Sequence, residues 1–261
     1  KAAHFILPLK KNRWIKTDRY AWAAANPQQT KTTQFQGLFR AIQLRFAPKN
    51  KNNVFELSLT LDKKIAKAAA RQIPIDATHV VIAQNLLPFI YETGALGGRT
   101  FDVFMTRLPF EKLHERLDLA YTHYKDSPTL HDFRASQQLI AIENKALNSA
   151  RKIITPHSEL AALFKNKAVK LDWQIPATPN KLSKGTKVLF PASAVGRKGA
   201  YEMRRLAKEL QLELCIYGRT IETTHFWQDL KVEKFNGDWR QIGLVVYPTY
   251  VEHQPRLLLK A

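Results

Sequence analysis

The sequence has few of the residues that build cysteine-rich or metal-binding proteins. Among 261 residues there is one cysteine, Cys215, which cannot form an intramolecular disulfide, and a zinc site made of several cysteines is excluded with it. The eight histidines form no HExxH motif. His114 and Asp118 are spaced by one helical turn, and we interpret that pair as a surface contact. We therefore expect no metal site and a reducing, cytoplasmic compartment.

Acidic residues are also scarce, with 22 Asp and Glu against 41 Lys and Arg, which gives a formal net charge of +19. Such an excess attracts polyanions, which include nucleic acid, anionic lipid headgroups and phosphorylated substrates, and the charge alone does not distinguish them. The sequence contains no apolar run of about 18 residues, so it predicts no membrane span. We also expect no signal peptide. Hydrophobic residues make up 45%, which is enough to build a core and excludes general disorder.

Short apolar runs alternate with amphipathic stretches along the chain, which is typical of βαβ units and a parallel sheet. The helical stretches show apolar residues at intervals of three and four, such as Leu139, Ile142 and Ala146. The sequence predicts strands at residues 79–83, 101–105, 152–155, 187–190, 212–217 and 244–247, and helices at 135–150, 159–164 and 198–210.

The alternation is interrupted between residues 172 and 187, where two prolines occur with little periodicity. We therefore predict a first domain at residues 1–175, a linker at 176–186 and a second domain at 187–261. Residues 255–261 read as the beginning of a helix without a capping residue. We expect the second domain to be incomplete, because the sequence ends within this predicted helix.

The most distinctive local pattern is a strand that leads into a loop of small residues and then a helix, over residues 190–200. Small residues let a phosphate approach the backbone, and a helix beginning near Gly199 would add its positive end. Arg197 and Lys198 place two cations at that point. The sequence contains neither a GxxxxGK[ST] loop nor a GxGxxG fingerprint. A tight turn with surface cations remains the alternative interpretation.

A second pattern follows the last predicted strand, where Glu252 precedes a helix that begins near Pro255. Ligands of open α/β sheets bind beyond the carboxyl ends of the strands. A carboxylate at this place could orient sugar hydroxyls, or it could simply cap the helix. Both readings stay open on the residues alone.

Together the two patterns resemble the nucleotide-sugar half of GT-B glycosyltransferases, in particular glycosyltransferase family 4. Residues 190–199 line up with the family's strand, GR-xxP-x-KG and helix run, and residues 245–261 with its PS-xx-E-G-xPxxxLEA run. The resemblance implies an α/β protein of GT-B type, with two Rossmann-like domains facing across a cleft. It also implies a retaining, metal-independent transfer of a sugar from a nucleotide-diphosphate donor, within bacterial glycan or glycoconjugate synthesis and without a further cofactor.

Carried over by position, the resemblance makes Lys198 the diphosphate-binding lysine and Glu252 the glutamate that contacts the donor sugar, and these two are the implied catalytic residues. The remaining implied donor-site residues are Ser193, Arg197, Gly199, Gln254 and Arg256. We place acceptor or cleft candidates at the ends of two strands of the first half, and these are Gln84, Asn85 and His157.

Three positions depart from the family pattern. Ser193 stands where the family has an arginine, and Lys260 stands where it has a second glutamate. Gln84 and Asn85 occupy the strand end where many relatives carry a histidine. The departures keep open a GT-B-shaped binding protein without activity.

The implied partners are a nucleotide-sugar donor and a glycan or lipid-linked acceptor. Because acceptors of such enzymes are often lipid-linked, we also expect a peripheral contact with anionic membrane at the inner face. A basic nucleic-acid-binding protein is a further alternative that rests on net charge only. No recognised nucleic-acid motif supports it, so we do not expect nucleic acid as a partner.

Overall fold

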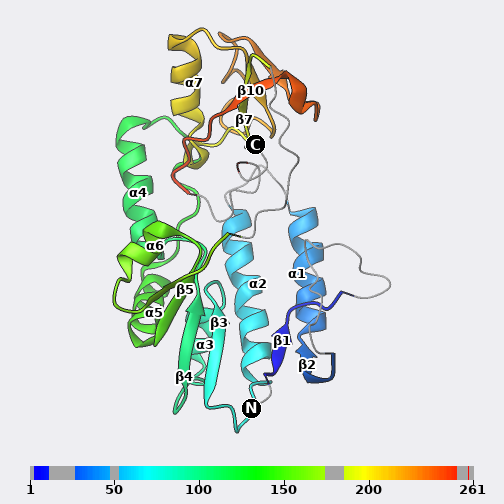
Figure 1. Cartoon of the computed structure of the whole chain (residues 1–261), viewed down its shortest axis with the longest axis vertical. Coiled ribbons are helices and arrows are strands. Elements are labelled where there is room, and N and C mark those ends of the chain that lie inside the picture. The colour runs from blue at the N-terminus through cyan, green and yellow to red at the C-terminus, as the bar shows by residue number, and fades with distance from the viewer. Residues whose placement is uncertain (1–2, 12–26, 48–52, 174–184, 252–257, 259–261) are drawn as a thin grey trace. The chain divides into compact units, whose positions relative to one another are not determined.

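The computed structural model describes residues 3–11, 27–47, 53–173, 185–251 and 258 (Figure 1). It is a mixed α/β structure with parallel sheets, and the chain divides into two compact units. The first unit consists of Lys1–Pro109 and Ala135–Leu171, and the second of Phe110–Arg134 and Asp172–Ala261. Each unit carries its own four-stranded sheet.

The sheet of the first unit has its strands in chain order and all parallel. It consists of β3 (His79–Ala83), β4 (Thr100–Phe104), β5 (Lys152–Thr155) and β6 (Ala168–Lys170). The predicted bounds of β3 and β5 are confirmed, and β4 begins one residue earlier than predicted. The sequence did not predict β6, which has only three residues and a charged lysine at its end.

The helices α3 (Leu87–Glu92), α5 (Gln137–Ser149) and α6 (Ser158–Leu163) connect these strands. Helix α5 begins after Ser136, whose hydroxyl accepts a hydrogen bond from the backbone N–H of Leu139 at 3.2 Å. That bond satisfies one of the N–H groups that the first turn leaves unpaired. The predicted helices at 135–150 and 159–164 are thus confirmed to within two residues at each end.

Further elements of the first unit precede this sheet in the sequence, and we call them a separate layer. Strands β1 (Phe5–Leu7) and β2 (Thr30–Thr32), with the short 3-10 helix η1 (Pro27–Gln29) before β2, form a two-stranded parallel sheet. Two longer helices follow, α1 (Gln34–Phe46) and α2 (Asn53–Ala70), and they pack against each other, with α2 also contacting α3 (Figure 1). No strand or helix of this layer was predicted from the sequence.

The second unit contains a parallel sheet whose strand order is β10-β7-β8-β9. The strands are β7 (Lys187–Phe190), β8 (Leu214–Ile216), β9 (Val232–Lys234) and β10 (Ile242–Val245), and the helices are α4 (Phe110–His123) and α7 (Ala200–Glu209), with 3-10 turns η2 (Gly196–Lys198) and η3 (Trp239–Gln241). The bounds of β7 are confirmed, β8 is shorter than predicted, and β10 begins two residues earlier.

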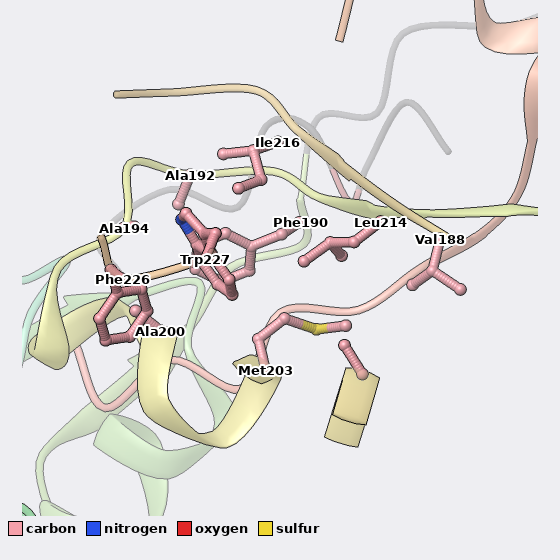
Figure 2. Close-up of a cluster of buried hydrophobic side chains, with 11 residues drawn as sticks. Val188, Phe190, Ala192, Ala194, Ala200, Met203, Leu214, Ile216, Phe226 and Trp227 are labelled. Atoms are coloured by element: carbon pink, nitrogen blue, oxygen red, sulfur yellow. The ribbon is translucent and has the colours of Figure 1, made fainter. Parts of the chain in front are cut away.

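Strand β7 is buried on both faces, as expected for a central parallel strand. Val188 and Phe190 point into a cluster with Met203 of α7 and with Trp227 (Figure 2). Leu189, between them, belongs to a second cluster with Cys215. The carboxyl end of β7 is therefore anchored by packing on each side.

The unit boundaries differ from the predicted domains at two places. The first unit ends at Leu171 and not at residue 175. The sequence analysis placed residues 110–134 in the first domain, whereas Phe110–Arg134 groups with the second unit. The contacts of Ser127 and Thr129, described below, explain that grouping. Most of the predicted linker lies outside the described residues, and so does the predicted helix from residue 255 apart from Leu258.

Candidate functional site

The strand order of the second unit identifies one position beyond the strand ends where a ligand can bind. From β7 the chain moves to β8 and β9 in one direction, and it then places β10 on the other side of β7. The order of the strands therefore reverses at β7. Ligands of open α/β sheets bind at such a topological switch point. The segments beyond it are residues 191–198 and 246–251.

The loop after β7 ends in a short turn that differs from the prediction. The sequence predicted a helix from Lys198, but Gly196–Lys198 form the 3-10 turn η2, and α7 begins at Ala200. Gly199 separates them because its φ of +79° is a left-handed conformation that interrupts a right-handed helix. Lys198 therefore ends η2 and does not lie in the first turn of α7.

Lys198 connects the two segments beyond the switch point. Its Nζ donates a hydrogen bond to the carbonyl oxygen of Val251 at 2.7 Å and lies 5.5 Å from the centroid of the Tyr247 ring. The backbone N–H of Tyr250 also donates to the carbonyl of Arg197 at 3.1 Å. The two patterns that the sequence analysis found 50 residues apart are thus adjacent in space, with a lysine ammonium between them.

Arg197 lies beside Lys198 in the chain, but its guanidinium packs over the ring of Phe133 with a separation of 5.4 Å. Burial lowers the pKa of Arg197, and the Asp132 carboxylate opposes that shift. Burial in turn raises the pKa of Asp132. The neighbouring cation is thus directed toward the segment that follows α4.

Glu222 is the residue of this region that the sequence analysis missed. Its side chain is buried, and its carboxylate accepts hydrogen bonds from the hydroxyls of Ser127 and Tyr201, each at 3.0 Å. The hydroxyl of Thr129 and the backbone N–H of Gly196 donate to the other oxygen. Glu222 therefore fixes the beginning of η2, two residues before Lys198.

The environment of Glu222 is tightly packed and holds the tyrosine neutral. Burial, with the Glu222 charge as a smaller contribution, raises the pKa of Tyr201 to about 12. The ring of Tyr124 stacks on that of Tyr201 with centroids 4.7 Å apart. Donors from three separate parts of the chain converge on one carboxylate, which makes Glu222 a support for the candidate site.

Ser193 lies in the loop after β7, half-buried, and its Oγ accepts a hydrogen bond from the backbone N–H of Arg219 at 3.3 Å. A side chain on Gly218 would collide with Ser193. The small residues at these two positions therefore permit a close approach of the loops that follow β7 and β8.

The acceptor candidates of the first unit follow the carboxyl ends of β3 and β5. Gln84 is buried, its Oε1 accepting from the backbone N–H of Arg107 at 3.2 Å, which makes it a brace between two loops. Asn85 is exposed, and its Nδ2 donates to Oδ2 of Asp62 at 3.1 Å. His157 precedes α6, with its backbone N–H donating to Thr155. The three share one edge of the sheet.

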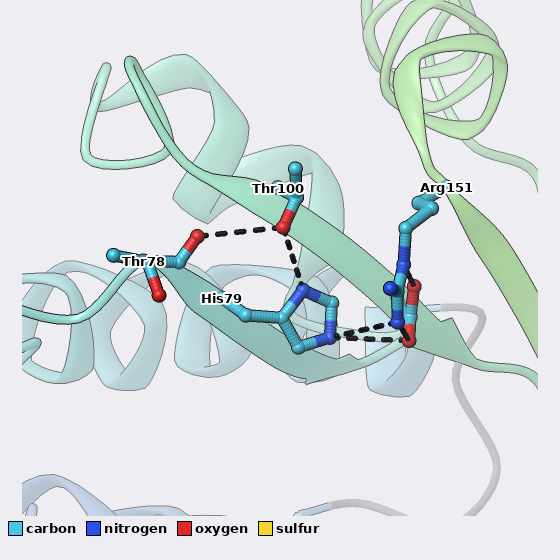
Figure 3. A network of polar contacts seen from close by, with 5 residues as sticks. Thr78, His79, Thr100 and Arg151 are labelled. Carbon is cyan, nitrogen blue, oxygen red and sulfur yellow. Dashed lines mark hydrogen bonds and ion pairs between the residues drawn. The ribbon is translucent and has the colours of Figure 1, made fainter. Parts of the chain in front are cut away.

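The opposite, amino edge of that sheet carries a polar network that the sequence analysis did not predict (Figure 3). Nε of Arg151 donates to Oδ1 of Asp102 at 2.9 Å, and a ring nitrogen of His79 lies 3.1 Å from Oδ2 of the same carboxylate. The hydrogen bond from Arg151, followed by the charge of His79, lowers the pKa of Asp102. The network joins the beginnings of three strands, at the edge opposite to the carboxyl ends where ligands of open α/β sheets bind.

Three predicted donor-site residues, Glu252, Gln254 and Arg256, lie outside the described residues, so their roles stay predictions. Within the described part of the chain, no group of three or more His, Cys, Asp or Glu side chains is placed to hold a metal ion. Asp118, paired with His114 in the sequence analysis, forms an ion pair with Arg134 at 2.7 Å. None of the helices in the described ranges is long and apolar enough to cross a bilayer.

Comparison with known proteins gives distant structural similarities. No protein-family model and no curated protein matches the sequence. Similar solved structures include a UGT transferase of Siraitia grosvenorii in complex with UDP (12% identity, TM-score 0.33) and an Arabidopsis thaliana UGT complexed with UDP (10%, 0.41). An α/β-galactoside α-2,3-sialyltransferase of Photobacterium phosphoreum is a third (11%, 0.31).

These alignments cover 87%, 84% and 75% of this chain in the same order. They cover 63%, 62% and 71% of the other proteins, so the chain spans less than two thirds of either UGT. With TM-scores between 0.31 and 0.41, the similarities do not assign the chain to a family.

Proposed function

We propose that this protein is a glycosyltransferase that moves a sugar from a nucleotide-diphosphate donor to a glycan or glycoconjugate acceptor. The observation that carries the proposal is the position of Lys198 between the segments that follow β7 and β10, at the switch point of the sheet. A cation at that place suits a diphosphate, because the crevice beyond the strand ends is where nucleotides bind in open α/β folds.

The contacts of Lys198 are compatible with exchange for a phosphate. Its ammonium donates to a neutral carbonyl, that of Val251, and lies near the Tyr247 ring. A hydrogen bond between an ammonium and a phosphate oxygen is charge-assisted and about twice as strong as one between neutral groups.

In this proposal leaving-group stabilisation is the main catalytic contribution. Negative charge develops on the diphosphate as the bond to the sugar breaks, and a fixed cation beside it lowers the barrier. Lys198 takes that role, held in place because Glu222 fixes the start of η2. Arg197, Ser193 and Gly199 shape the same loop, and Gly199 allows the close approach of the segment after β10.

The finer assignments follow the family resemblance. We propose that Glu252 orients the donor sugar and that Gln254 and Arg256 lie against the diphosphate. Transfer would retain the anomeric configuration and use no metal ion. Gln84, Asn85 and His157 are the proposed acceptor-side residues. Because Gln84 braces a loop through its side chain, Asn85 and His157 are the stronger candidates for contact with an acceptor.

A binding protein without catalytic activity is the second candidate. It is favoured by Ser193, which offers no positive charge where the family pattern has an arginine. A transfer assay with radiolabelled nucleotide sugars, run on the full chain, separates the two. Donor binding without transfer or donor hydrolysis would establish the binding protein.

Calorimetry with UDP, GDP, ADP and CDP tests the donor site directly. Lys198→Ala is expected to weaken binding of the preferred nucleotide by about tenfold to a hundredfold, because a charge-assisted contact contributes roughly 1.5–3 kcal/mol. Lys208→Ala is the charge-matched control, since Lys208 lies on α7 and pairs with Asp229 at 3.3 Å. Equal binding by the parent and both variants would show that the donor site is elsewhere.

A second control separates charge from structure. Thr249 holds the same segment through its hydroxyl, which lies 2.9 Å from the carbonyl oxygen of Val251. Thr249→Val removes that hydrogen bond and keeps the positive charge of Lys198. If Thr249→Val weakens nucleotide binding as much as Lys198→Ala does, Lys198 acts through the fold of the segment and the proposed contact with diphosphate is wrong.

A further inference from the structure

Helix α1 presents its large apolar side chains outward. Phe35 is 88% exposed and Phe46 is 77% exposed, and three more apolar side chains of the helix are exposed by more than two fifths, namely Leu38, Phe39 and Ile42. The spacing of the five residues by three, four, seven and eleven positions puts them on one face of the helix. We call the face formed by Phe35, Leu38, Phe39, Ile42 and Phe46 the α1 ridge.

The opposite face of α1 packs against the protein and includes Gly37 and Arg40. Gly37 is buried, and a side chain at that position would collide with the backbone of Pro8. Nε of Arg40 donates to Oδ1 of Asp62 on α2 at 2.7 Å. The helix is therefore held to the first unit by a close backbone approach and an ion pair, while the five apolar residues of the α1 ridge lie outside. Burial of apolar surface normally drives the reverse orientation.

The part of the sequence that contains α1 has no acidic residue from residue 19 to residue 55. Arg45 and Lys31 are exposed. Lys64 of α2 is exposed as well, and its Nζ lies 5.1 Å from the centroid of the Phe39 ring. An apolar ridge bordered by cations is the pattern of a helix that lies in the interface of an anionic bilayer.

We propose that the α1 ridge docks on the surface of an anionic lipid bilayer, with the phenyl rings entering the boundary between headgroups and acyl chains. The ridge is a convex helix face, which a fluid bilayer can receive without a complementary pocket. A second copy of this chain fits less well, because it would bring the same cations together without an acidic partner. The acid-free stretch favours an anionic surface over a neutral one.

The proposal is tested by co-sedimentation of the full chain with vesicles, without donor or acceptor. The parent is expected to bind vesicles of phosphatidylcholine and phosphatidylglycerol and to stay in solution with phosphatidylcholine alone. The double variant Phe35→Gln/Phe46→Gln is expected to bind the mixed vesicles at least tenfold more weakly. The matched control is Ile75→Gln/Leu119→Gln, which removes two exposed apolar side chains elsewhere and should bind as the parent does.

Two further measurements identify a different occupant of the ridge. Thermal unfolding of the ridge variant should match that of the parent, and a clear loss of stability with unchanged vesicle binding would show that the chain itself covers the ridge. Light scattering should show the same mass for both proteins. If the parent is a dimer and the substitutions dissociate it, a second copy of this chain covers the ridge and the bilayer proposal is wrong. Absence of binding to mixed vesicles, or equal losses in the control, overturns the proposal. Each of these outcomes leaves the proposed sugar transfer untouched, because no step uses the nucleotide site.

Discussion

The backbone carbonyl of Pro248 occupies the space that a side chain at Gly199 would need. This approach brings the segment after β10 against the turn that carries Lys198, so the two halves of the candidate site are in contact through backbone atoms. Two features therefore favour glycine at position 199. A side chain would collide with Pro248, and the φ of +79° would by itself strain a residue with a side chain.

Gly199→Ala is expected to destabilise the second unit by about 2–4 kcal/mol. The left-handed conformation costs roughly 1–2 kcal/mol for a residue with a Cβ, and the collision with Pro248 adds to that. Urea unfolding measures the change. Gly237→Ala is the control, because Gly237 has a φ of +97° with open space around its Cβ position and should lose only the conformational part. Equal losses in the two variants would contradict the close approach.

Glu222→Ala is expected to lower the free energy of unfolding by about 2–4 kcal/mol, because it leaves several buried donors without an acceptor. Tyr201→Phe removes one of those donors together with its need for an acceptor, and should cost roughly 1 kcal/mol. Chemical denaturation of both variants provides the comparison. Glu213→Ala, at an exposed glutamate of the same unit, should leave stability unchanged. A Glu222→Ala protein as stable as the parent would contradict the role of Glu222 as the acceptor for these donors.

Asp102 gives the first unit a pH dependence in the acid range. Since its folded pKa is lowered, chiefly by the hydrogen bond from Arg151, its contribution is present above the unfolded value of about 3.9 and is lost as pH falls below it. We expect Asp102→Asn to melt lower than the parent at neutral pH, with the two melting temperatures converging below about pH 4. Asp76→Asn, at an exposed aspartate, is the control. A difference that stays constant with pH argues against this linkage.

Cys215 should be inert in the folded protein. Its side chain is buried, and burial, followed by its hydrogen bond to Glu233, raises the pKa of the thiol to about 12. The thiolate is the reactive species, so labelling by a thiol reagent at about pH 8 should be slow for the native chain and fast in concentrated guanidinium chloride. Rapid labelling of native protein would show that β8 opens or that the thiol is accessible.

The sequence predicted those elements in which consecutive side chains indicate how the element is buried. Strand β7 was found because Val188, Leu189 and Phe190 form an apolar run that is buried on both faces. Strand β9 was missed because two of its three residues, Glu233 and Lys234, are charged. Helix α1 was missed although five apolar residues, Phe35, Leu38, Phe39, Ile42 and Phe46, recur at helical spacing in the sequence.

The candidate site was predictable in part for the same reason. Lys198 follows a recognisable strand and a loop of small residues, which are consecutive in the sequence. Glu222 has no such neighbourhood, because its partner Ser127 is 95 positions away and Thr129 is 93 positions away. The strand order that creates the switch point is equally non-local, since β10 pairs with β7 across more than 50 residues.

The interleaving of the two units along the chain has a consequence for synthesis on the ribosome. Phe110–Arg134 belongs to the second unit, although Ala135–Leu171, which follows it, completes the first. When residue 171 emerges, the first unit has its full sheet, while Ser127 and Thr129 still lack the carboxylate that they will bind. That segment has to stay unpaired until Glu222 has been translated. A polypeptide that starts at residue 172 would, for the same reason, lack two of the four donors to its buried glutamate, and the second unit is not a module that a single cut can release.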